Sequence, residues 1–473
     1  MSAPRHGLDR IRRIHFIGIG GAGMGGIAEV LHTLGFEVSG SDTHASEMTR
    51  RLAGLGVRVH SGHRTEHVHD CDVVVVSTAI PYGNSELEAA RECQIPIVPR
   101  AEMLGEIMRF RHGIAVAGTH GKTTTTSLVT SVLSAGGLDP TFVIGGRLLA
   151  SGANGRLGDG RYLVAEADES DESFLRLWPE MAVVTNIDHD HMGTWNHDES
   201  RLHAAFVEFL RHLPFYGLAV LCADDPGVRA VLPQVSRPVL TYGFGEGADL
   251  RAVDVTARGT RTRFRIPAGD LGPEVTVTLN LPGRHNVLNA LAAVAVARSL
   301  EIDDGQIGRA LSTFEGIGRR FEVRERVRIG GHEVRLVDDY GHHPREIEAT
   351  MAAAREAWPA QRLVVAFQPH RFTRTRDLFH EFARVLSLAD ALLVTDVYPA
   401  GEDPIPGADA PSLCQAVRAR GMVEPVYVPG VDELGATLLG VVLTDDVLLL
   451  LGAGDIGTAA ATLANGGGPC GAG

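Results

Sequence analysis

Short apolar runs alternate with longer helical stretches along most of the chain, and glycines or acidic residues stand at many of the junctions. The first apolar run begins at Ile14, turns on glycines, continues as a helical stretch and returns to a second strand that ends at Asp42. Residues 73–80, VVVVSTAI, read as a further strand of the same sheet, because continuous apolar character is typical of a parallel strand covered on both faces. Residues 1–108 are therefore predicted to form a Rossmann-like domain.

A second block, residues 109–322, begins with a comparable pattern. Ile114–Ala117 reads as a buried strand, Gly118 and Gly121 supply a turn, and residues 123–135 read as a helix. Backbone N–H groups and the helix dipole make such a turn a binding site for phosphate. Further strands are expected within 162–174 and 182–195, and an alanine-rich helix within 282–297. This block is predicted to be a phosphate-loop domain with a mostly parallel sheet.

The third block, residues 323–473, repeats the alternation. The apolar segments RLVDDY, RLVVAF, ALLVTDVY and VLLLLGAG are separated by helical stretches. Such a βαβ series predicts an open, mostly parallel sheet, and hence a second Rossmann-like domain. The segment GAGDIG, 452–457, is interpreted as a tight turn between a strand and a helix. The fold class is therefore α/β, with three domains.

The composition of the chain limits the kinds of partner and the location that we expect. The chain of 473 residues has a net charge of −14 and no basic run, which disfavours a nucleic-acid partner. Five scattered cysteines without metal-type spacing are typical of thiols in a reducing cytosol. No segment resembles a signal peptide or a membrane span. We expect a cytoplasmic protein without a membrane or nucleic-acid partner, as a monomer or a weak homodimer.

The use of basic residues singles out one position. Lysines and arginines number 44, and Lys122 is the only lysine among them. It stands between Gly121 and Thr123 in AVAGTHGKTTTTS. A phosphate loop needs a compact charge on a flexible stem, whereas arginine is a broad planar fork. Lys122 is therefore predicted to bind phosphate, and the Thr123 hydroxyl to bind magnesium.

Acidic residues and histidines follow two strands of the second block. Glu166 ends one strand, and a cluster of further acids follows it at Asp168, Glu169, Asp171 and Glu172. The strand within 182–195 leads to Asp188, His189, Asp190 and His191. Hard cations prefer oxygen ligands. Behind a phosphate loop, these residues predict a magnesium site.

The other two blocks have candidate sites of their own. In the third block, the arginines Arg371, Arg374 and Arg376 lie just past a strand end, where ligands bind in such sheets. In the first block, glycines fit G-x-G-x-x-G and Asp42 follows about twenty residues later, which is the fingerprint of dinucleotide binding. An NAD-dependent dehydrogenase is therefore one alternative, although it leaves the phosphate loop and the acidic cluster unexplained.

The ordered motifs GIGGAGMGG, GTHGKTTTT, EADESD, TNIDHDH, GRHNVLNALAA, FEGIGRRF, DDYGHHP and PHRFTRT resemble those of the Mur ligase family. The resemblance spans nearly the whole chain. It implies that residues 1–108 bind a UDP-sugar, that 109–322 form the ATPase, and that 323–473 receive an amino acid. It also implies a ligation in which ATP and Mg²⁺ activate the lactyl carboxylate of UDP-N-acetylmuramate as an acyl phosphate, which L-alanine attacks.

The resemblance implies roles for individual residues. ATP would be held by Gly118, Thr119, His120, Gly121, Lys122, Thr123 and Thr124. Asn286 and Asn289 would flank the adenine, Arg320 would reach a phosphate, and Asp339 the ribose. The catalytic residues would be Lys122, Glu166, His191 and Arg320, and the metal ligands Thr123, Glu166 and His191. The UDP-sugar would be bound by Gly18, Gly20, Gly21, Gly23, Asp42, Ser77 and Thr78, and the amino acid by Tyr340, His342, Arg371 and Arg374.

The single lysine also discriminates within the family. Sister ligases that add D-glutamate, a diamino acid or a dipeptide use a carbamylated lysine beyond the DH motif, and NHDESRLHAAFVEFL contains none. The chain departs from the family at Gly193, where an aspartate is usual, so the role of that aspartate must be met otherwise. A ligase that recycles a whole tripeptide remains an alternative, and a nucleotide-sensing module is a more distant one.

Overall fold

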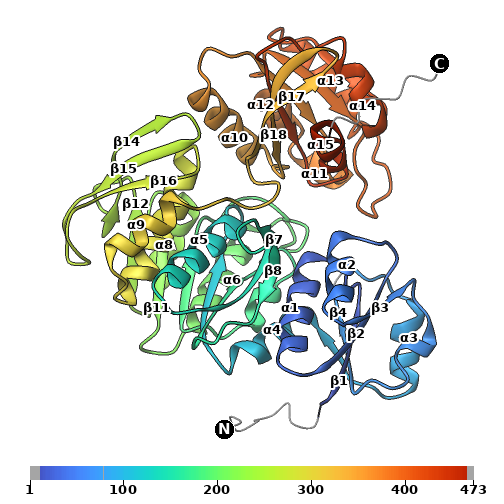
Figure 1. Ribbon diagram of the computed structural model, residues 1–473, viewed down its shortest axis with the longest axis vertical. Helices are drawn as coiled ribbons and strands as arrows, with labels where there is room; N and C mark the ends of the chain where they lie inside the picture. Colours follow the sequence, from blue (N-terminus) through green and yellow to red (C-terminus); the bar gives the residue numbers. More distant parts are fainter. Residues whose placement is uncertain (1–10, 78, 466–473) are drawn as a thin grey trace. The chain divides into compact units, whose positions relative to one another are not determined.

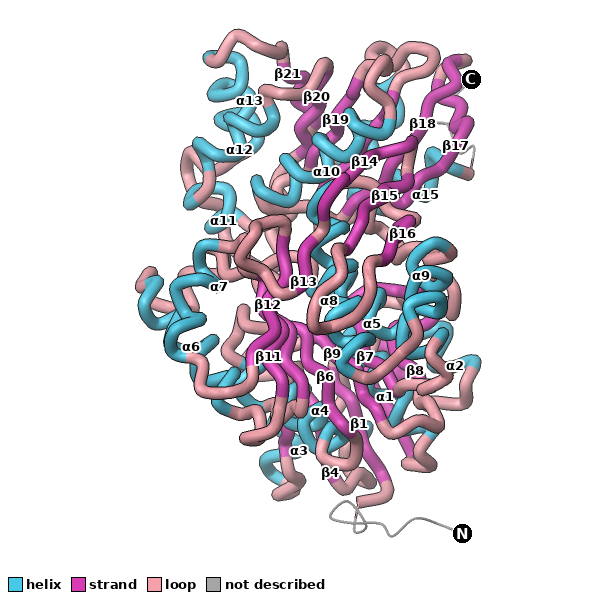
Figure 2. Tube along the Cα trace, turned by 90° about the vertical axis from the view of Figure 1, so that its left-hand side faces the viewer, coloured by secondary structure: helices cyan, strands magenta, loops and turns pink. Residues whose placement is uncertain are grey.

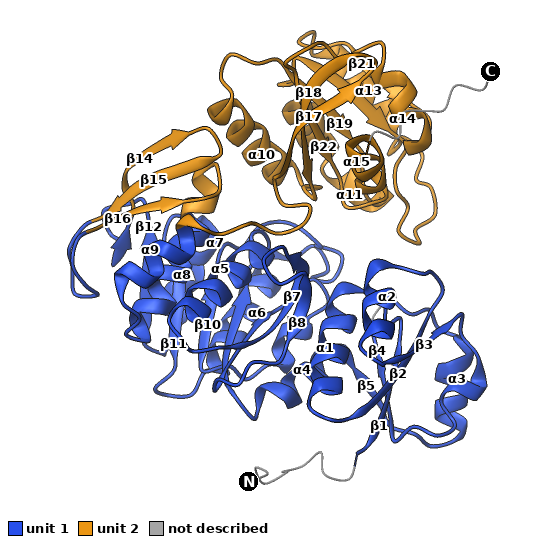
Figure 3. Cartoon of the chain, in the orientation of Figure 1, with its two compact units in different colours: residues 1–251, 267–274, 288–311 blue, residues 252–266, 275–287, 312–473 orange. Residues whose placement is uncertain are grey.

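The computed structural model describes residues 11–77 and 79–465 of the chain. Internal contacts divide the chain into two compact units (Figure 3). Unit 1 comprises residues 1–251, 267–274 and 288–311, and unit 2 comprises residues 252–266, 275–287 and 312–473. The predicted domain boundaries at residues 108 and 322 stay a prediction.

The first sheet of unit 1 is parallel throughout, with strand order β3-β2-β1-β4-β5. Its strands are β1 Arg13–Ile17, β2 Glu37–Asp42, β3 Arg58–Ser61, β4 Val73–Val76 and β5 Ile97–Pro99. The helices are α1 Ala22–Thr33, α2 Glu47–Gly54, α3 Ser85–Glu92 and α4 Arg100–Met108. The core residues of α1, α2 and α4 pack with Phe16, while those of α3 pack with Ile17. Helices therefore cover both faces, and the Rossmann-like prediction is confirmed, with β4 ending four residues earlier than expected.

The second sheet of unit 1 has the order β13-β12-β11-β10-β6-β9-β7-β8 and is parallel except for the β7–β8 pair. Its strands are β6 His112–Ala117, β7 Thr141–Leu148, β8 Ala153–Arg156, β9 Tyr162–Glu166, β10 Met181–Val184, β11 Leu218–Cys222, β12 Val239–Gly243 and β13 Leu250–Arg251. The helices of this region are α5 Lys122–Ala135, α6 Glu199–Arg211, α7 Pro226–Val231, α8 Arg284–Ser299 and α9 Asp304–Ser312. The predicted mostly parallel sheet is confirmed.

The strand order places three predicted motifs at one edge. β6 lies between β10 and β9, and all three strands run parallel. Figure 2 shows β6 beside β9. Val116 pairs with Glu166, and Ala117 pairs with Val184. The carboxyl ends of these strands therefore bring together the phosphate loop after β6, Glu166 at the end of β9 and the acidic segment after β10, at the edge where ligands bind in such sheets.

Unit 2 begins with a small antiparallel sheet that the sequence analysis did not predict. It has the order β14-β15-β16, with β14 Val253–Arg258, β15 Arg261–Ile266 and β16 Val275–Leu279. In β15, Thr262, Phe264 and Ile266 are buried while Arg261 and Arg263 are exposed. This period of two is the signal of a strand with one buried face, and it was missed.

The larger sheet of unit 2 has the order β17-β18-β22-β19-β20-β21 and is parallel except for the β17–β18 pair. The strands β17 and β18 lie side by side in Figure 1. Its strands are β17 Glu322–Ile329, β18 His332–Asp339, β19 Leu363–Phe367, β20 Ala391–Thr395, β21 Pro425–Val428 and β22 Val447–Leu451. The helices are α10 Pro344–Ala357, α11 Phe372–Asp377, α12 Phe379–Leu386, α13 Ala410–Ala419, α14 Val431–Leu438 and α15 Ile456–Ala464. Helices α10, α12 and α13 share a core on one face, and α14 and α15 on the other, which confirms the second Rossmann-like domain.

Among the described residues, no helix combines the length and apolar character that crossing a membrane requires.

Candidate active site

The phosphate loop depends on two glycines between β6 and α5. Gly118 has φ +126° and Gly121, the N-cap of α5, has φ +81°, a region that disfavours residues with a Cβ. Space is also lacking, because a Cβ on Gly118 would collide with the Thr185 hydroxyl and one on Gly121 would lie 2.7 Å from Asn289 Oδ1. The backbone can therefore approach its neighbours closely, as binding of phosphate to main-chain amides requires.

The loop is fastened to the segment that follows β10. The Thr119 amide donates to the Asn186 carbonyl at 3.1 Å, and the His120 amide donates to Asn186 Oδ1 at 2.8 Å. Thr185 Oγ1 donates to the His120 carbonyl at 2.6 Å, and the Asp188 amide donates to Thr119 Oγ1 at 2.8 Å. Thr185 and Asn186 belong to the motif TNIDHDH, and no role was predicted for them. They hold the loop in shape.

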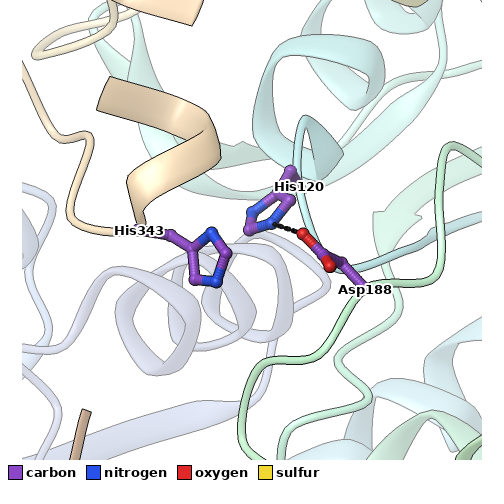
Figure 4. A group of neighbouring side chains, drawn as sticks. All are labelled: His120, Asp188 and His343. Carbon is purple, nitrogen blue, oxygen red and sulfur yellow. Dashed lines mark hydrogen bonds and ion pairs between the residues drawn. The ribbon is translucent and has the colours of Figure 1, made fainter. Parts of the chain in front are cut away.

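His120 is oriented by an acid from the same segment. Its Nε2 lies 3.0 Å from Asp188 Oδ2, and both side chains are largely buried (Figure 4). A buried imidazole with a carboxylate partner has a defined ring orientation. The first acid of the predicted metal cluster, Asp188, thus contacts the loop itself.

Lys122 is the first residue of α5, and its ammonium group has three acceptors. Nζ lies 2.7 Å from the Gly118 carbonyl, 3.4 Å from the Thr119 carbonyl and 2.7 Å from Glu169 Oε2. Burial lowers the pKa of Lys122, but the carboxylates of Glu169 and Asp168 raise it by more, so it stands above its usual value. Burial raises the pKa of Glu169, and Lys122 opposes this shift. The lysine remains a cation.

Glu166 ends β9 and is held from the neighbouring strand. The amide of Gly145, in β7, donates to Glu166 Oε1 at 2.6 Å. A Cβ on Gly145 would lie 2.9 Å from Glu166 Oε2. Because a larger residue would displace the carboxylate, Gly145 is a supporting residue that the sequence analysis missed.

His191 is oriented by its neighbour Asp190. The His191 amide donates to Asp190 Oδ1 at 2.8 Å, and His191 Nε2 lies 3.6 Å from Asp190 Oδ2. His191 has φ +53°, in the left-handed region that is uncommon for residues other than glycine. Nothing lies within 4 Å of a Cβ placed on Gly193, so the aspartate usual in the family has room there, and its absence leaves open space.

The remaining predicted ATP residues divide between the units. Thr123 and Thr124 are buried in the first turn of α5. Thr125 Oγ1 donates to Asn289 Oδ1 at 3.1 Å, which places Asn289 beside the phosphate loop. Asn286, one turn earlier in α8, belongs to unit 2 and donates from Nδ2 to the Pro282 carbonyl at 2.8 Å.

The glycine loop of the first sheet is held by the end of β2. The amides of Gly18 and Ile19 donate to the Ser41 carbonyl at 2.8 and 3.0 Å, and the Gly20 amide donates to Asp42 Oδ2 at 2.8 Å. Asp42 therefore fixes the loop, whereas in a dinucleotide site the acid binds ribose. Gly21 is the N-cap of α1, and a Cβ on Gly23 would collide with the Arg100 guanidinium.

Of the two further residues predicted to bind the UDP-sugar, Ser77 follows β4, and its carbonyl accepts from the Ile80 amide at 3.2 Å. Thr78 lies outside the described residues.

The buried carboxylate of Glu86 supports this first loop through Ser41, whose carbonyl accepts from the loop amides. Glu86 Oε2 accepts from Ser41 Oγ at 2.5 Å and lies 3.0 Å from His63 Nδ1. Glu86 Oε1 lies 2.6 Å from His67 Nδ1 and 3.6 Å from His15 Nε2. Burial raises the pKa of Glu86, but the neighbouring His15 and the contacts with Ser41 and His67 lower it by more, so that the pKa is about 2. This cluster was not predicted, because its residues come from five separate segments of the chain.

In unit 2, Asp339 connects two turns. Its Oδ2 accepts from the Phe321 amide at 2.7 Å, and its Oδ1 accepts from the Gly341 amide at 2.8 Å. Burial raises the pKa of this carboxyl, an effect that Arg320 opposes. The resemblance implies ribose binding for Asp339, and the geometry adds that it shapes the loops on either side of β17 and β18.

Arg319 and Arg320 both lie over the ring of Tyr340, at 5.3 and 4.9 Å from its centroid. Arg319 also donates from Nη2 to the Gly452 carbonyl at 2.6 Å, so the GAGDIG turn holds a side chain of this cluster. The interpretation of that segment as a strand–helix turn agrees with α15 starting at Ile456.

The predicted amino-acid residues meet around a histidine that was not assigned. His370 lies with its ring 5.8 Å from that of His342, and its Nδ1 lies 3.4 Å from Arg374 Nη1. The Tyr340 ring is edge-on to His342, with the centroids 5.4 Å apart. Arg371 is nearly half exposed and lies 3.9 Å from Glu402 Oε1. Unit 2 thus brings Tyr340, His342 and Arg374 together, with Arg371 at the N-cap of α11.

Comparison with known proteins identifies the family. Residues 13–112 match the model described as Mur ligase family, catalytic domain. Residues 116–297 match the Mur ligase middle domain, and residues 319–454 match the model described as Mur ligase, glutamate ligase domain.

Two curated relatives cover almost the whole chain. A UDP-N-acetylmuramate–L-alanine ligase of Halorhodospira halophila is 60% identical over 468 residues, which are 98% of this chain and 96% of the relative. A protein of the same name from Methylococcus capsulatus is 57% identical, over 98% of both chains. The crystal structure of the UDP-N-acetylmuramate–alanine ligase of Thermotoga maritima is 30% identical with a TM-score of 0.82, covering 96% of this chain and 98% of that one.

A murein peptide ligase from Psychrobacter arcticus has the same fold, with 24% identity and a TM-score of 0.71, over 97% of this chain and 99% of that one. Three family models that together span most of the chain, and relatives of 57–60% identity, show that the chain belongs to the Mur ligase family.

Proposed function

We propose that the protein joins L-alanine to the lactyl carboxylate of UDP-N-acetylmuramate at the expense of ATP, which gives UDP-N-acetylmuramoyl-L-alanine, ADP and phosphate, a step in peptidoglycan precursor synthesis in the cytoplasm. The observation that carries the proposal is the single lysine, Lys122, in a phosphate loop beside Glu166 at one sheet edge. The names of the two curated relatives support the choice of substrates.

ATP would bind at the phosphate loop. Lys122 would contact the β- and γ-phosphates, and the amides at the start of α5 would contact their oxygens. Asn289, which already lies beside Gly121, would reach the nucleotide from α8 together with Asn286. Arg320 would contribute a further positive charge and Asp339 would contact the ribose. These roles follow the family resemblance, and the position of Asn289 next to the loop supports them.

Magnesium fits the donors at this edge. The Thr123 hydroxyl and the Glu166 carboxylate offer the oxygen ligands that Mg²⁺ prefers, and the Gly145 amide holds Glu166 in place. His191 would complete the set for a second ion, with Asp190 orienting its ring. Bound Mg²⁺ would neutralise charge on the phosphates as the phosphoryl group is transferred.

The first step brings anions together, since the lactyl carboxylate attacks the γ-phosphate. Lys122 and Arg320 offset the repulsion, and positioning by the rigid loop supplies much of the remaining acceleration. The product is an acyl phosphate and ADP.

In the second step the neutral amine of L-alanine attacks the acyl carbonyl, a tetrahedral intermediate forms and phosphate leaves. The guanidinium groups of Arg371 and Arg374 would donate hydrogen bonds to the carboxylate of the amino acid. A histidine is suited to accept the amine proton near pH 7. His342, whose ring contacts those of Tyr340 and His370, would take this role.

The test is an assay of phosphate release with UDP-N-acetylmuramate, ATP and single amino acids. We expect L-alanine to be preferred over glycine and L-serine, with D-alanine and acidic amino acids poor. Discrimination against glycine is expected to be modest, because one methyl group in an apolar pocket is worth roughly 1–3 kcal/mol. Preference for an intact tripeptide would transfer the protein to the recycling ligases, and phosphate release with none of these substrates would overturn the proposal.

The amino-acid site has its own test in helix α11. Arg371→Ala is expected to raise the KM for L-alanine about tenfold or more while leaving that for ATP nearly unchanged, because a charged anchor of the carboxylate is lost. Arg376→Ala is the matched control, since Arg376 is exposed on the same helix and pairs only with its neighbour Asp377 at 2.7 Å in the described structure. Equal rises in both KM values would show that Arg371 serves the nucleotide instead.

The alternative of an NAD-dependent dehydrogenase is tested by fluorescence titration with NADH. No binding is expected, because the acid that would hold the ribose, Asp42, already accepts from the Gly20 amide. Saturable NADH binding would revive that alternative.

A further inference from the structure

We propose that Glu169 is the internal counter-ion of Lys122, and that the phosphates of the nucleotide must displace Glu169 from the lysine when they bind. Glu169 would thus be a positioning residue that sets the affinity for ATP. The inference rests on the proposed function, because it assumes that the ligand of the loop is a nucleotide.

The geometry at Lys122 carries the argument. An ammonium group has three hydrogens to donate, and Nζ has three acceptors, at 2.7 Å (Gly118 O), 3.4 Å (Thr119 O) and 2.7 Å (Glu169 Oε2). Every donor of Lys122 is therefore directed to an acceptor within the protein. A phosphate oxygen can bind only if one of these three is given up.

Glu169 is the acceptor that the phosphate would replace. The two carbonyls belong to the phosphate loop, which Asn186 and Thr185 hold in shape. A carbonyl oxygen has only a partial charge, whereas Glu169 is an anion, and a phosphate oxygen brought to Lys122 would repel it. The exchange of one anion for another leaves the loop intact.

The ion pair between Lys122 and Glu169 is buried, which makes its two charges interact strongly. The exposed fractions of the side chains are 15% for Lys122 and 4% for Glu169, so water screens their attraction little. Burial also raises the pKa of Glu169, since a carboxylate there is poorly solvated without its cation. Asp168 adjoins it and has its own partner, Arg100, at 3.8 Å. Before the nucleotide arrives, Glu169 keeps the only lysine of the chain directed into the loop.

The experiment measures nucleotide binding to the full-length protein. Calorimetric titration with ADP and with a non-hydrolysable ATP analogue, both with Mg²⁺, gives the Kd, and thermal unfolding gives the Tm with and without nucleotide. The variants are Glu169→Gln, Glu169→Asp and the control Glu92→Gln. Glu92 is exposed at the end of helix α3, outside the predicted metal and nucleotide sites, so its substitution removes the same charge without touching Lys122.

The proposal predicts that Glu169→Gln lowers the Kd about tenfold, because no ion pair has to be broken on binding. Its Tm without nucleotide falls, because a buried cation is left without its partner. This deficit shrinks at saturating nucleotide, where phosphate supplies the missing anion. Glu169→Asp, which keeps the charge at a greater distance, lowers the Kd about two- to threefold. Glu92→Gln behaves as the wild type.

A purely structural role for Glu169 gives a different result. In that case the Tm deficit of Glu169→Gln is the same with and without nucleotide, and the Kd is unchanged or higher; either observation overturns the proposal. If Glu169→Gln does not fold, Glu169→Asp answers the same question. A wild-type protein that binds neither nucleotide would instead overturn the proposed function, whereas wild-type binding with an unchanged Kd in both Glu169 variants overturns only the exchange.

Discussion

The two glycine-rich loops of unit 1 occupy the same kind of junction between a strand and a helix, but they have different anchors. Each follows a central parallel strand, β1 or β6, and ends at the N-terminus of a helix. The first loop, residues 18–23, is held by the carboxylate of Asp42 and contains no basic residue. The second loop, residues 118–122, is held by the amide and hydroxyl groups of Asn186 and Thr185 and contains Lys122.

The comparison distinguishes what the backbone of such a loop contributes from what its charged side chains contribute. Both loops lead into the N-terminus of a helix, where main-chain amides can bind phosphate. Only the second loop adds a compact cation and neighbouring acids, Glu166 and Glu169, as a triphosphate with magnesium requires. A glycine fingerprint alone therefore does not distinguish a UDP-sugar from NAD.

The largest expected effect is in the second loop. Lys122→Arg keeps the charge but replaces a point cation by a planar fork between the loop carbonyls, so it tests geometry. We expect kcat to fall by 10²-fold or more, or about 2.7 kcal/mol or more in barrier, with an intact fold by circular dichroism. A kcat near that of the wild type would remove the reason for treating the two loops differently.

The contribution of Glu86, which supports the first loop, to the free energy of unfolding should depend on pH. Glu86→Gln is expected to lower the free energy of unfolding by about 2 kcal/mol at pH 7, because hydrogen bonds to a charged acceptor are lost. The folded-state pKa of about 2 lies below the usual 4.5. The contribution of Glu86 is thus present above about pH 4.5 and is lost as the pH falls from 4.5 towards 2.

Urea unfolding at several pH values measures this effect. Glu88→Gln, on the exposed side of the same helix α3, is the matched control and should change little. A difference between Glu86→Gln and the wild type that stays constant down to pH 2 would contradict the assignment of the low pKa to Glu86.

The dependence of the rate on magnesium should distinguish the second loop from the first. Glu166→Ala is expected to raise the magnesium concentration for half-maximal rate about tenfold, and His191→Ala less steeply, about threefold, because an oxygen ligand is lost in one case and a nitrogen ligand in the other. The KM for UDP-N-acetylmuramate at saturating magnesium serves as the control and should change little. Magnesium titrations that do not shift in either variant would place the metal elsewhere.

The smallest effect is expected in the first loop. Asp42→Ala removes the acceptor of the Gly20 amide and should raise the KM for the UDP-sugar about three- to tenfold, as the loss of one hydrogen bond to a charged group allows. The KM for ATP should not change. If both KM values rise together, the two loops do not act as separate sites.

Prediction from the sequence succeeded where the signal was local. The apolar runs located β1, β6, β9 and four strands of the larger sheet of unit 2, namely β18, β19, β20 and β22, and the glycines located both turns, because strand and turn preferences act over a few residues. The outer strands β17 and β21 were not predicted. The antiparallel β14-β15-β16 sheet was missed although alternation in Thr262, Phe264 and Ile266 was present. The domain boundaries and the roles of the site residues stay predictions.

Contacts between distant segments could not be predicted in the same way. Gly145 holds Glu166 across 21 positions, Asn186 holds His120 across 66, and Glu86 contacts Ser41 across 45. None of these pairs has a spacing that a motif would reveal, since each depends on which strands, helices and loops become neighbours in the folded chain.

The sequence by itself determined the family, the parallel α/β fold and the position of the one lysine, because these depend on apolar periodicity, on glycines and on narrow local motifs. Only the tertiary structure decided that Lys122 is paired with Glu169, that Asp42 holds its own loop and that His370 joins Tyr340, His342 and Arg374. The physical reason is that the energy of a charge or a hydrogen bond depends on its surroundings in space, and strand order brings those surroundings from remote parts of the chain.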